Sequence, residues 1–325
     1  MKNCNFPLGD KELKIGMLGF TEGNAHPFSW SAMFNGYDKD EMRKWCAKDY
    51  PAIPSYLNKQ PAHTLGIPGA KITHICFTGD EDRTTAEGCA KATFIPNVCD
   101  RPEEMIGQVD AVICATDKGF EHVERVRPFI EAGIPLFIDK PMTDNEEDLR
   151  TLVKWHDEGA KFISSSSMRY KKELEPYIHN RYEFGPIRYI LSPMAKYWEN
   201  YGIHALEGIF PLIGQGVEWV QNVGTKDRAM VHLYHKDGIH VDMPMGKMAS
   251  TGISVCGEYA AKIITSADSY YSFKKQLDEF VKWLRTGEID YPFEDTIEMA
   301  KIIIAGIRSR EEGGRRVYLS EIHER

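Results

Sequence analysis

The sequence predicts an α/β protein in which a doubly wound parallel sheet precedes a second α/β domain with an open, mainly antiparallel sheet. In the first half of the chain, short apolar runs alternate with helical segments, which is the order that builds a parallel sheet. Beyond about residue 168, strand-like runs follow one another with few helices between them. We therefore expect domains at residues 1–167 and 168–325, with an insertion at about 37–70.

Composition restricts the class of protein. A chain of 325 residues that is 42% hydrophobic can bury two cores. The net charge of -8 argues against nucleic acid as a partner, because phosphates require a basic face. No apolar run approaches the roughly 20 residues of a membrane span, and the amino terminus lacks the apolar stretch of a signal peptide. We expect a cytoplasmic protein that binds neither nucleic acid nor membrane.

The seven cysteines favour reduced thiols over disulfides or a metal site. Their number is odd and no two form a C-x-x-C pair. Cys76 and Cys114 lie inside apolar, strand-like runs, as buried free thiols do. We expect no bound metal.

The first strand predicts part of a dinucleotide-binding unit. It covers residues 13–18 and runs into a turn that contains Gly19, Gly23 and Asn24, after which a helix begins. Backbone N–H groups at the start of a helix can hold a pyrophosphate, so these three residues are candidate cofactor ligands. The glycines do not follow the usual G-x-G-x-x-G spacing, and Glu22 adds a carboxylate. A plain strand–turn–helix is the alternative.

An acidic cluster follows the second predicted strand, which covers residues 72–78. An acid at this position accepts hydrogen bonds from an adenosine ribose and repels a 2'-phosphate. Asp80 is the best candidate, and it favours NAD over NADP. The alternative is that the cluster only caps the helix predicted at residues 84–91.

The centre of the chain places a lysine at the end of a buried strand. A third strand at 109–116 and a helix at 121–132 lead to the apolar run 136–138, which stops at Asp139 and Lys140. Ligands of open parallel sheets bind at the carboxyl ends of the strands. Lys140 is therefore a candidate for chemistry, and a surface lysine beside a turn is the alternative.

The second domain is expected to form oligomers. Its predicted strands lie at 187–191, 229–234, 239–243, 253–257 and 261–265, and two helices at 273–285 and 296–310 close the chain. An open sheet exposes one face, and the runs 253–256 and 261–264 are too apolar to leave that face in water. We expect a homodimer or homotetramer.

Several motifs match in order and spacing over nearly the whole chain. They are residues 109–116, His122, residues 133–141, Arg169-Tyr170, residues 185–187 and residues 309–319. With them the chain resembles the Gfo/Idh/MocA oxidoreductases, named after glucose-fructose oxidoreductase, inositol dehydrogenase and a rhizopine catabolism protein. The resemblance implies a Rossmann domain, an α/β domain with an open sheet, a nicotinamide cofactor, and substrates that are usually sugars, cyclitols or their derivatives.

The resemblance also assigns residues to the site. Lys140 matches the active-site lysine of the family's Glu-Lys-Pro segment, in which Asp139 replaces the Glu. Thr116, His122 and Asp139 fall in the segments expected to bind the cofactor. The family's second signature is an Asp followed four residues later by His, and here these positions are Asn200 and His204.

These assignments are consistent with dehydrogenation. Residues four apart on a helix share a face, so Asn200 and His204 can face one cleft. Asparagine cannot take up a proton, which leaves Lys140 and His204 as the titratable pair. Either can be the base that removes a hydroxyl proton as hydride leaves carbon. Four nearby polar residues are candidates for binding substrate: Arg169, Tyr170, Lys196 and Tyr201.

Three hypotheses follow from the sequence. The first is an NAD(P)-dependent dehydrogenase or reductase of a sugar, a cyclitol or a derivative. The second is an NAD-dependent glycosidase of the same fold. The third is a non-catalytic relative that binds a cofactor or ligand, which the altered glycine turn and Asn200 permit.

Overall fold

The computed structural model describes residues 6–79, 82–248, 252–265 and 268–325. The chain divides into two compact units. The first contains Met1–Asp139, Trp155–Ser164 and Phe273–Asp290, and the second contains Lys140–Lys154, Ser165–Ser272 and Tyr291–Arg325. The chain thus passes between the units several times, whereas the sequence suggested one boundary at residue 167.

The first unit contains a parallel sheet of six strands in the order β3-β2-β1-β4-β5-β6. This is the strand order of dinucleotide-binding folds, so the predicted doubly wound sheet is confirmed. Its strands are β1 (Leu13–Phe20), β2 (Ala70–Gly79), β3 (Asn97–Cys99), β4 (Ala111–Cys114), β5 (Leu136–Ile138) and β6 (Phe162–Ile163). All residues of β4 and β5 are buried, as expected for strands covered on both faces.

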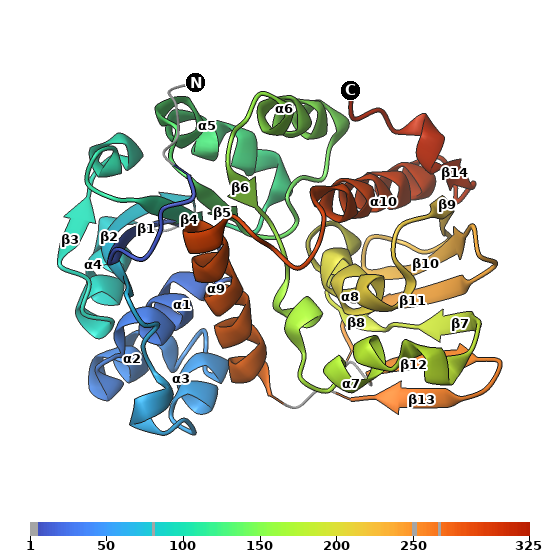
Figure 1. Cartoon of the computed structure of the whole chain (residues 1–325), viewed down its shortest axis with the longest axis horizontal. Coiled ribbons are helices and arrows are strands. Elements are labelled where there is room, and N and C mark those ends of the chain that lie inside the picture. The colour runs from blue at the N-terminus through green and yellow to red at the C-terminus, as the bar shows by residue number, and fades with distance from the viewer. Residues whose placement is uncertain (1–5, 80–81, 249–251, 266–267) are drawn as a thin grey trace. The chain divides into compact units, whose positions relative to one another are not determined.

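Helices cover this sheet on both sides (Figure 1). The helices α1 (His26–Asn35), α4 (Arg83–Ala92) and α5 (His122–Ala132) pack on its strands, whereas α2 (Lys39–Cys46) and α3 (Ala52–Leu57) pack on α4 and α1. Aromatic side chains join helix to strand: Trp30 of α1 makes an edge contact with Phe137 of β5 at 5.6 Å. Phe280 of α9 (Ser269–Thr286) contacts the same Phe137 at 5.5 Å. This packing explains why residues 273–290 belong to the first unit, although every strand of the second sheet except β14 (Val317–Tyr318) precedes them in sequence.

The second unit contains a mixed sheet of eight strands. Seven follow the order β13-β12-β7-β11-β10-β9-β14, and β8 pairs with β11. The pairs of β11 with β7 and β8 are parallel and the others are antiparallel. The strands are β7 (Ile187–Leu191), β8 (Met194–Ala195), β9 (Val217–Asn222), β10 (Arg228–His235), β11 (His240–Gly246), β12 (Ile253–Gly257), β13 (Ala261–Ile264) and β14 (Val317–Tyr318).

Two long helices, α8 (Trp198–Ile213) and α10 (Phe293–Glu311), pack against each other and against β9 and β11. Burial alternates along β10, so Val231 and Leu233 face these helices while Met230 and His232 point away. The remaining helices are α6 (Glu146–Asp157) and α7 (Glu175–His179). Short 3-10 helices are η1 (Ala62–Thr64), η2 (Pro102–Met105), η3 (Gly119–Glu121), η4 (Ser167–Tyr170), η5 (Arg181–Phe184) and η6 (Leu319–Glu321).

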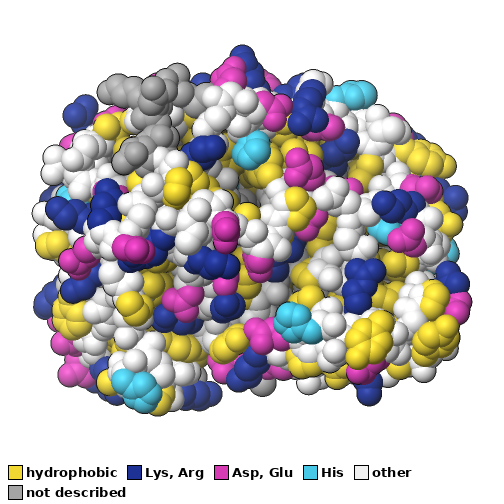
Figure 2. Space-filling model, viewed as in Figure 1, with side chains coloured by type: hydrophobic (Ala, Val, Ile, Leu, Met, Phe, Trp, Pro, Cys, Tyr) yellow, Lys and Arg dark blue, Asp and Glu magenta, His cyan; other side chains and the backbone are white. Residues whose placement is uncertain are grey.

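The surface carries charge of both signs. On the face drawn in Figure 2, the basic and acidic side chains of the described residues are interspersed. Within the described ranges, no helix is long and apolar enough to cross a membrane.

Candidate active site

The turn after β1 lies at the carboxyl edge of the parallel sheet. Gly19 has φ +88°, and a Cβ built on it would lie 2.5 Å from Cγ2 of Thr116. Glycine is therefore required at this position. Gly23 has φ +80°, but a Cβ there would meet no atom within 4 Å. The backbone at Gly23 thus borders open space, which a ligand can approach closely.

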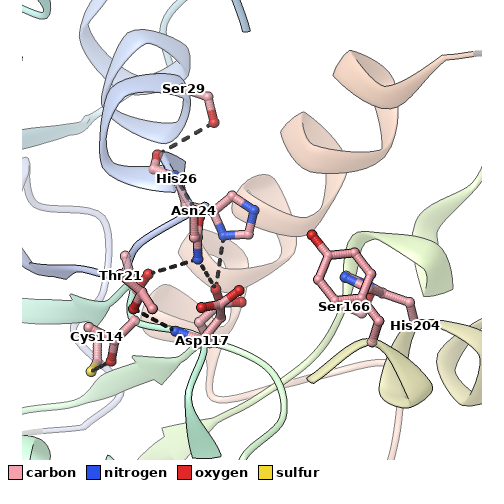
Figure 3. A network of polar contacts seen from close by, with 12 residues as sticks. Thr21, Asn24, His26, Ser29, Cys114, Asp117, Ser166 and His204 are labelled. Carbon is pink, nitrogen blue, oxygen red and sulfur yellow. Dashed lines mark hydrogen bonds and ion pairs between the residues drawn. The ribbon is translucent and has the colours of Figure 1, made fainter. Parts of the chain in front are cut away.

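Three side chains join this turn to the end of β5. Asn24 donates to the carbonyl oxygen of Ala115 at 3.3 Å and to Oδ2 of Asp139 at 3.4 Å. Its own Oδ1 accepts from the backbone N–H of His26. Nδ1 of His26 lies 2.8 Å from the same Oδ2 of Asp139, which is fully buried. The structure therefore brings the predicted Asn24 and Asp139 together and adds His26. Figure 3 shows Asn24 and His26 side by side.

The segment after β4 closes the other side of the turn. The hydroxyl of Thr21 accepts a hydrogen bond from the backbone N–H of Asp117 at 3.3 Å (Figure 3). Thr116 is fully buried, and Nε2 of the buried His122 donates to its carbonyl oxygen at 2.7 Å. The predicted Gly19, Thr116 and His122 thus form one packed edge of the sheet.

This edge fits a dinucleotide. The strand order is that of nucleotide-binding sheets, and the open backbone at Gly23 lies at the start of α1, where N–H groups can face a phosphate. First-turn acids, which would repel a phosphate, are absent from α1. Glu22 is exposed in the turn.

Asp80, the predicted ribose ligand, lies outside the described residues. Its described neighbour Asp82 caps α4 by accepting from the N–H of Thr85 at 3.1 Å. Arg83 points to carboxylates, because its Nε donates to Glu87 at 2.8 Å and its Nη1 pairs with Asp100.

In the second unit, Tyr201 connects three other predicted residues through its ring and hydroxyl. Nζ of the buried Lys140 lies 4.8 Å from the centre of the Tyr201 ring, and Nζ of Lys196 lies 4.3 Å from it. Lys196 also donates to the Tyr201 hydroxyl at 2.7 Å. The His204 ring makes an edge contact with Tyr201 at 4.8 Å. The four predicted residues therefore form a cluster around Tyr201, which lies with His204 on the first turns of α8.

Lys196 adopts an unusual backbone conformation. Its φ is +64°, in the left-handed region that residues other than glycine seldom occupy. Such strain is of the order of 1 kcal/mol and is common at functional sites. The conformation places the exposed Lys196 side chain against Tyr201, five residues later.

His204 is held by Ser166. Nδ1 of His204 lies 2.5 Å from Oγ of Ser166, which also accepts from the N–H of Met168 (Figure 3). The backbone N–H of Ser166 donates to Oε1 of Glu207 at 2.9 Å. His204 and Glu207 are three apart on α8, so one face of this helix holds Ser166 at two points.

Arg169 is engaged by buried carboxylates. Its Nε donates to Glu207 at 2.5 Å, its Nη2 lies 3.6 Å from Asp295, and its guanidinium lies over the ring of Tyr291. Burial has the largest single effect on Arg169 and lowers its pKa, but the charge and hydrogen bond of Glu207, together with Tyr291 and Tyr170, outweigh burial and raise the pKa. Tyr170 is also buried, so the side chains of both predicted residues are packed inside the second unit.

Asn200 stands where the resemblance noted in the sequence leads us to expect aspartate. Its Oδ1 is buried and has no hydrogen-bond partner among the described residues. One helical turn separates it from His204. The structure therefore presents a hydrogen-bond acceptor in place of a proton carrier.

Sequence reasoning missed His26, Ser166 and Glu207. A signal for His26 was present in the sequence, because the helix after the glycine turn begins at this residue. A signal for Glu207 was also present, because it lies three residues after His204 and thus on the same helix face. Ser166 gave no signal of its own within the run of serines at 164–167. Among the described residues, no group of three His, Cys, Asp or Glu side chains is arranged to hold a metal ion.

Comparison with known proteins agrees with this geometry. A family model described as "oxidoreductase family, NAD-binding Rossmann fold" matches residues 50–165. Over these residues the predicted resemblance to the Gfo/Idh/MocA oxidoreductases is confirmed. The match includes Thr116, His122 and the Asp139-Lys140 segment. A search of curated proteins found no match.

Several solved structures share the fold of nearly the whole chain. Apo scyllo-inositol dehydrogenase from Lactobacillus casei has a TM-score of 0.75 at 14% identity and covers 96% of this chain and 100% of its own. The same enzyme with NAD(H) and scyllo-inositol has a TM-score of 0.71 at 15% identity, with coverage of 95% and 100%. An oxidoreductase from Agrobacterium radiobacter in complex with NAD+, L-tartaric acid and magnesium has a TM-score of 0.71 at 14% identity, with coverage of 96% and 100%.

Proposed function

We propose that the chain is an NAD(P)-dependent oxidoreductase that transfers hydride between a nicotinamide and a hydroxyl-bearing carbon of a sugar, a cyclitol or a derivative. One observation carries the proposal: Lys140 directly follows β5 at the carboxyl edge of a sheet with dinucleotide-binding order, and it contacts the cluster that contains His204. The cofactor, when bound, supplies the hydride acceptor or donor. The protein must then move one proton at the substrate oxygen.

Lys140 and His204 are the residues that can move this proton. If Nε2 of His204 is the base, Nδ1 carries the hydrogen and donates it to Ser166 Oγ, which fixes the ring and its tautomer. Lys140 then orients the hydroxyl and stabilises the developing alkoxide. With Lys140 as the base, His204 takes the orienting role. Oδ1 of Asn200 accepts a hydrogen bond from another substrate hydroxyl.

Arg169 acts as a positioning residue in this proposal. It holds Glu207, which holds the backbone of Ser166, and Ser166 holds His204. Lys196 and Tyr201 remain the proposed substrate-binding residues, since both belong to the cluster with Lys140.

We propose NAD as the preferred cofactor. The proposal rests on Asp80, which follows the β2 segment in the sequence, and on Arg83, whose pairing with Glu87 and Asp100 opposes a contact with a 2'-phosphate. Repulsion between Asp80 and this phosphate corresponds to roughly ten- to hundred-fold weaker NADP binding. Calorimetric titration of the protein with each dinucleotide measures the ratio. Equal affinities would refute the role of Asp80.

We also propose a homo-oligomer formed through the second unit. On the sheet face turned away from α8 and α10, paired positions on adjacent strands carry Tyr318, Trp219, Tyr234, His240 and Tyr189. Trp219 stacks on Tyr234 at 5.6 Å, and Tyr234 meets His240 at 5.1 Å. We call these five residues the aromatic row. An aromatic row across an open sheet is suited to burial against a second copy of the chain.

The test of the function is turnover. The purified protein is mixed with NAD and, separately, scyllo-inositol, myo-inositol and L-tartrate, and NADH absorbance is followed. Production of NADH with a polyol or hydroxy acid supports the proposal. Release of an aglycone from a glycoside without net NADH indicates the glycosidase alternative. Absence of nicotinamide binding in calorimetry rejects both and favours a ligand-binding protein.

A further inference from the structure

The second unit contains a cavity whose lining residues have no role in the proposed proton transfer. Its volume is about 240 Å³, enough for a small organic molecule. Six apolar or mainly apolar side chains form its walls: Met168, Leu174, Pro193, Met194, Ile253 and Ile264. The side chains of Lys171 and Glu173 also line it. We call it the Lys171 cavity.

Lys171 is an unusual lysine. The residue is 8% exposed, and across the described ranges its ammonium group makes no hydrogen bond or ion pair. Burial lowers its pKa, and the charges of Glu173 and Asp268 oppose this effect only in part. Asp268 is engaged by the neighbouring Lys172, whose Nζ donates to it at 2.7 Å. A buried ammonium in an apolar cavity is stabilised most by an anion that enters that cavity.

We propose that the Lys171 cavity is a binding site for small carboxylic acids. The carboxylate of the ligand pairs with the Lys171 ammonium, and its hydrocarbon body packs against the six wall residues. The carboxylate of Glu173 faces the same space and weakens the binding of anions. Removing the Glu173 charge therefore strengthens the binding, and removing the Lys171 charge abolishes it.

The cavity adjoins the helix that carries His204. A Cβ on Gly208 would lie 2.8 Å from Cδ1 of Ile253 and 3.7 Å from Cε of Met168, so two wall residues contact α8 one turn after His204. The bound carboxylate can therefore come from two sources. It is either the acid group of a substrate that reaches His204 or a separate acid that binds beside it.

The chain offers a matched pair of variants. Lys171→Met removes the buried charge, and Lys172→Met removes an exposed lysine one residue away, with the same change in net charge. The probe is isovalerate, and its neutral counterpart is isovaleramide. Binding is measured by calorimetry and by the shift in melting temperature, without NAD or substrate. The result therefore does not depend on the proposed dehydrogenase activity.

We expect isovalerate to bind the wild type and Lys172→Met equally, and Lys171→Met at least about tenfold more weakly. Glu173→Gln should bind isovalerate more tightly than the wild type. Isovaleramide should bind all four proteins weakly. If isovalerate and isovaleramide bind the wild type alike, or if Lys171→Met binds isovalerate as well as Lys172→Met does, the proposal is overturned.

A second arm distinguishes the sources of the carboxylate. It uses a hydroxy acid that the protein oxidises, and isovalerate is titrated at saturating concentrations of that acid. Competition between the two shows that the cavity receives the acid group of the substrate. Undiminished binding of isovalerate shows a separate acid site. Both results support an acid-binding cavity.

Discussion

At the scale of single residues, the cluster around Tyr201 makes the catalytic hypothesis specific. Lys140 and Lys196 are both lysines and both lie near the Tyr201 ring, but Lys140 is buried and Lys196 is exposed. We propose that Lys140 acts in proton transfer and that Lys196 binds substrate. The two residues therefore form a matched pair for mutation.

Lys140→Met should lower kcat by about 10²- to 10⁴-fold, the usual contribution of a general acid or base. Its affinity for NAD should change little, because the lost interaction belongs to the transition state. Lys196→Met should mainly raise KM. Steady-state kinetics with calorimetry for NAD separates the two effects. Near wild-type turnover in Lys140→Met would leave this lysine a structural role only and favour the ligand-binding alternative.

Lys171 leads to a prediction about stability and pH. Because burial lowers its pKa, the unfolded chain binds more protons than the folded chain between the lowered and the ordinary lysine values. At pH values below this window, the buried charge therefore reduces the free energy of unfolding. This reduction disappears as the pH rises through the window. Ligand-free Lys171→Met should be more stable than the wild type at neutral pH, by on the order of 1 kcal/mol.

Urea unfolding at a series of pH values measures this difference. The advantage of Lys171→Met should shrink at alkaline pH. Lys172→Met should show no such advantage, because the hydrogen bond to Asp268 raises the pKa of Lys172. An advantage of Lys171→Met that is constant with pH would show that hydrophobic contact, and not the lost charge, causes it.

At the scale of elements, the sequence predicted the strands and helices that have a clear period or a continuous apolar run, and it missed strands that have neither. β7 and β12 have the predicted bounds, and α9 and α10 contain the predicted helices. The strands β3, β8 and β14 have two or three residues each, too few to show alternation. β9 was missed although it has six residues, because Glu218 and Gln221 interrupt its apolar pattern.

The candidate site could be predicted only where it followed a strand or a motif. Asp139 and Lys140 follow the continuous apolar run of β5, and His204 was predicted from the resemblance to a family signature. Contacts between segments distant in sequence carry no local signal, as the pairs Ser166–His204 and His26–Asp139 show. Periodicity likewise did not reveal that Arg169 faces Glu207.

The two glycines of the first turn give a prediction for that element. Both have positive φ, so alanine at either site strains the backbone by about 1–2 kcal/mol. Gly19→Ala also forces its Cβ against the methyl groups of Thr116 and Thr78, and overpacking adds about 1–3 kcal/mol. Gly19→Ala should therefore reduce the free energy of unfolding more than Gly23→Ala.

In calorimetry, Gly23→Ala should bind NAD more weakly than the wild type does, although it reduces stability less than Gly19→Ala. The reason is that its added methyl group enters the open space at the start of α1. Equal losses of stability in the two variants would mean that the Thr116 side chain moves away from the added Cβ at residue 19 without a cost in free energy. Unchanged NAD affinity in Gly23→Ala would place the pyrophosphate away from this turn.

At the scale of the whole molecule, the outward face of the second sheet carries exposed apolar side chains. Beside the aromatic row, Ile263 is 72% exposed and Met230 is 41% exposed, and both lie on strands of that face. A single chain leaves these side chains in water. An interface through the sheet face buries them together with the aromatic row, and the hydrophobic effect then favours association.

Ile263→Glu should shift the oligomer toward the mass of one chain, because a carboxylate in a buried interface lacks a partner. The fold itself should tolerate the change, since the side chain is exposed within one chain. Phe120→Glu is the control: Phe120 is 60% exposed in the first unit, and its replacement should leave the mass unchanged. Sedimentation equilibrium of the wild type and both variants at micromolar concentration measures the masses. A wild type that sediments as one chain would refute the oligomer, and an Ile263→Glu variant that keeps the wild-type mass would place its interface away from β13.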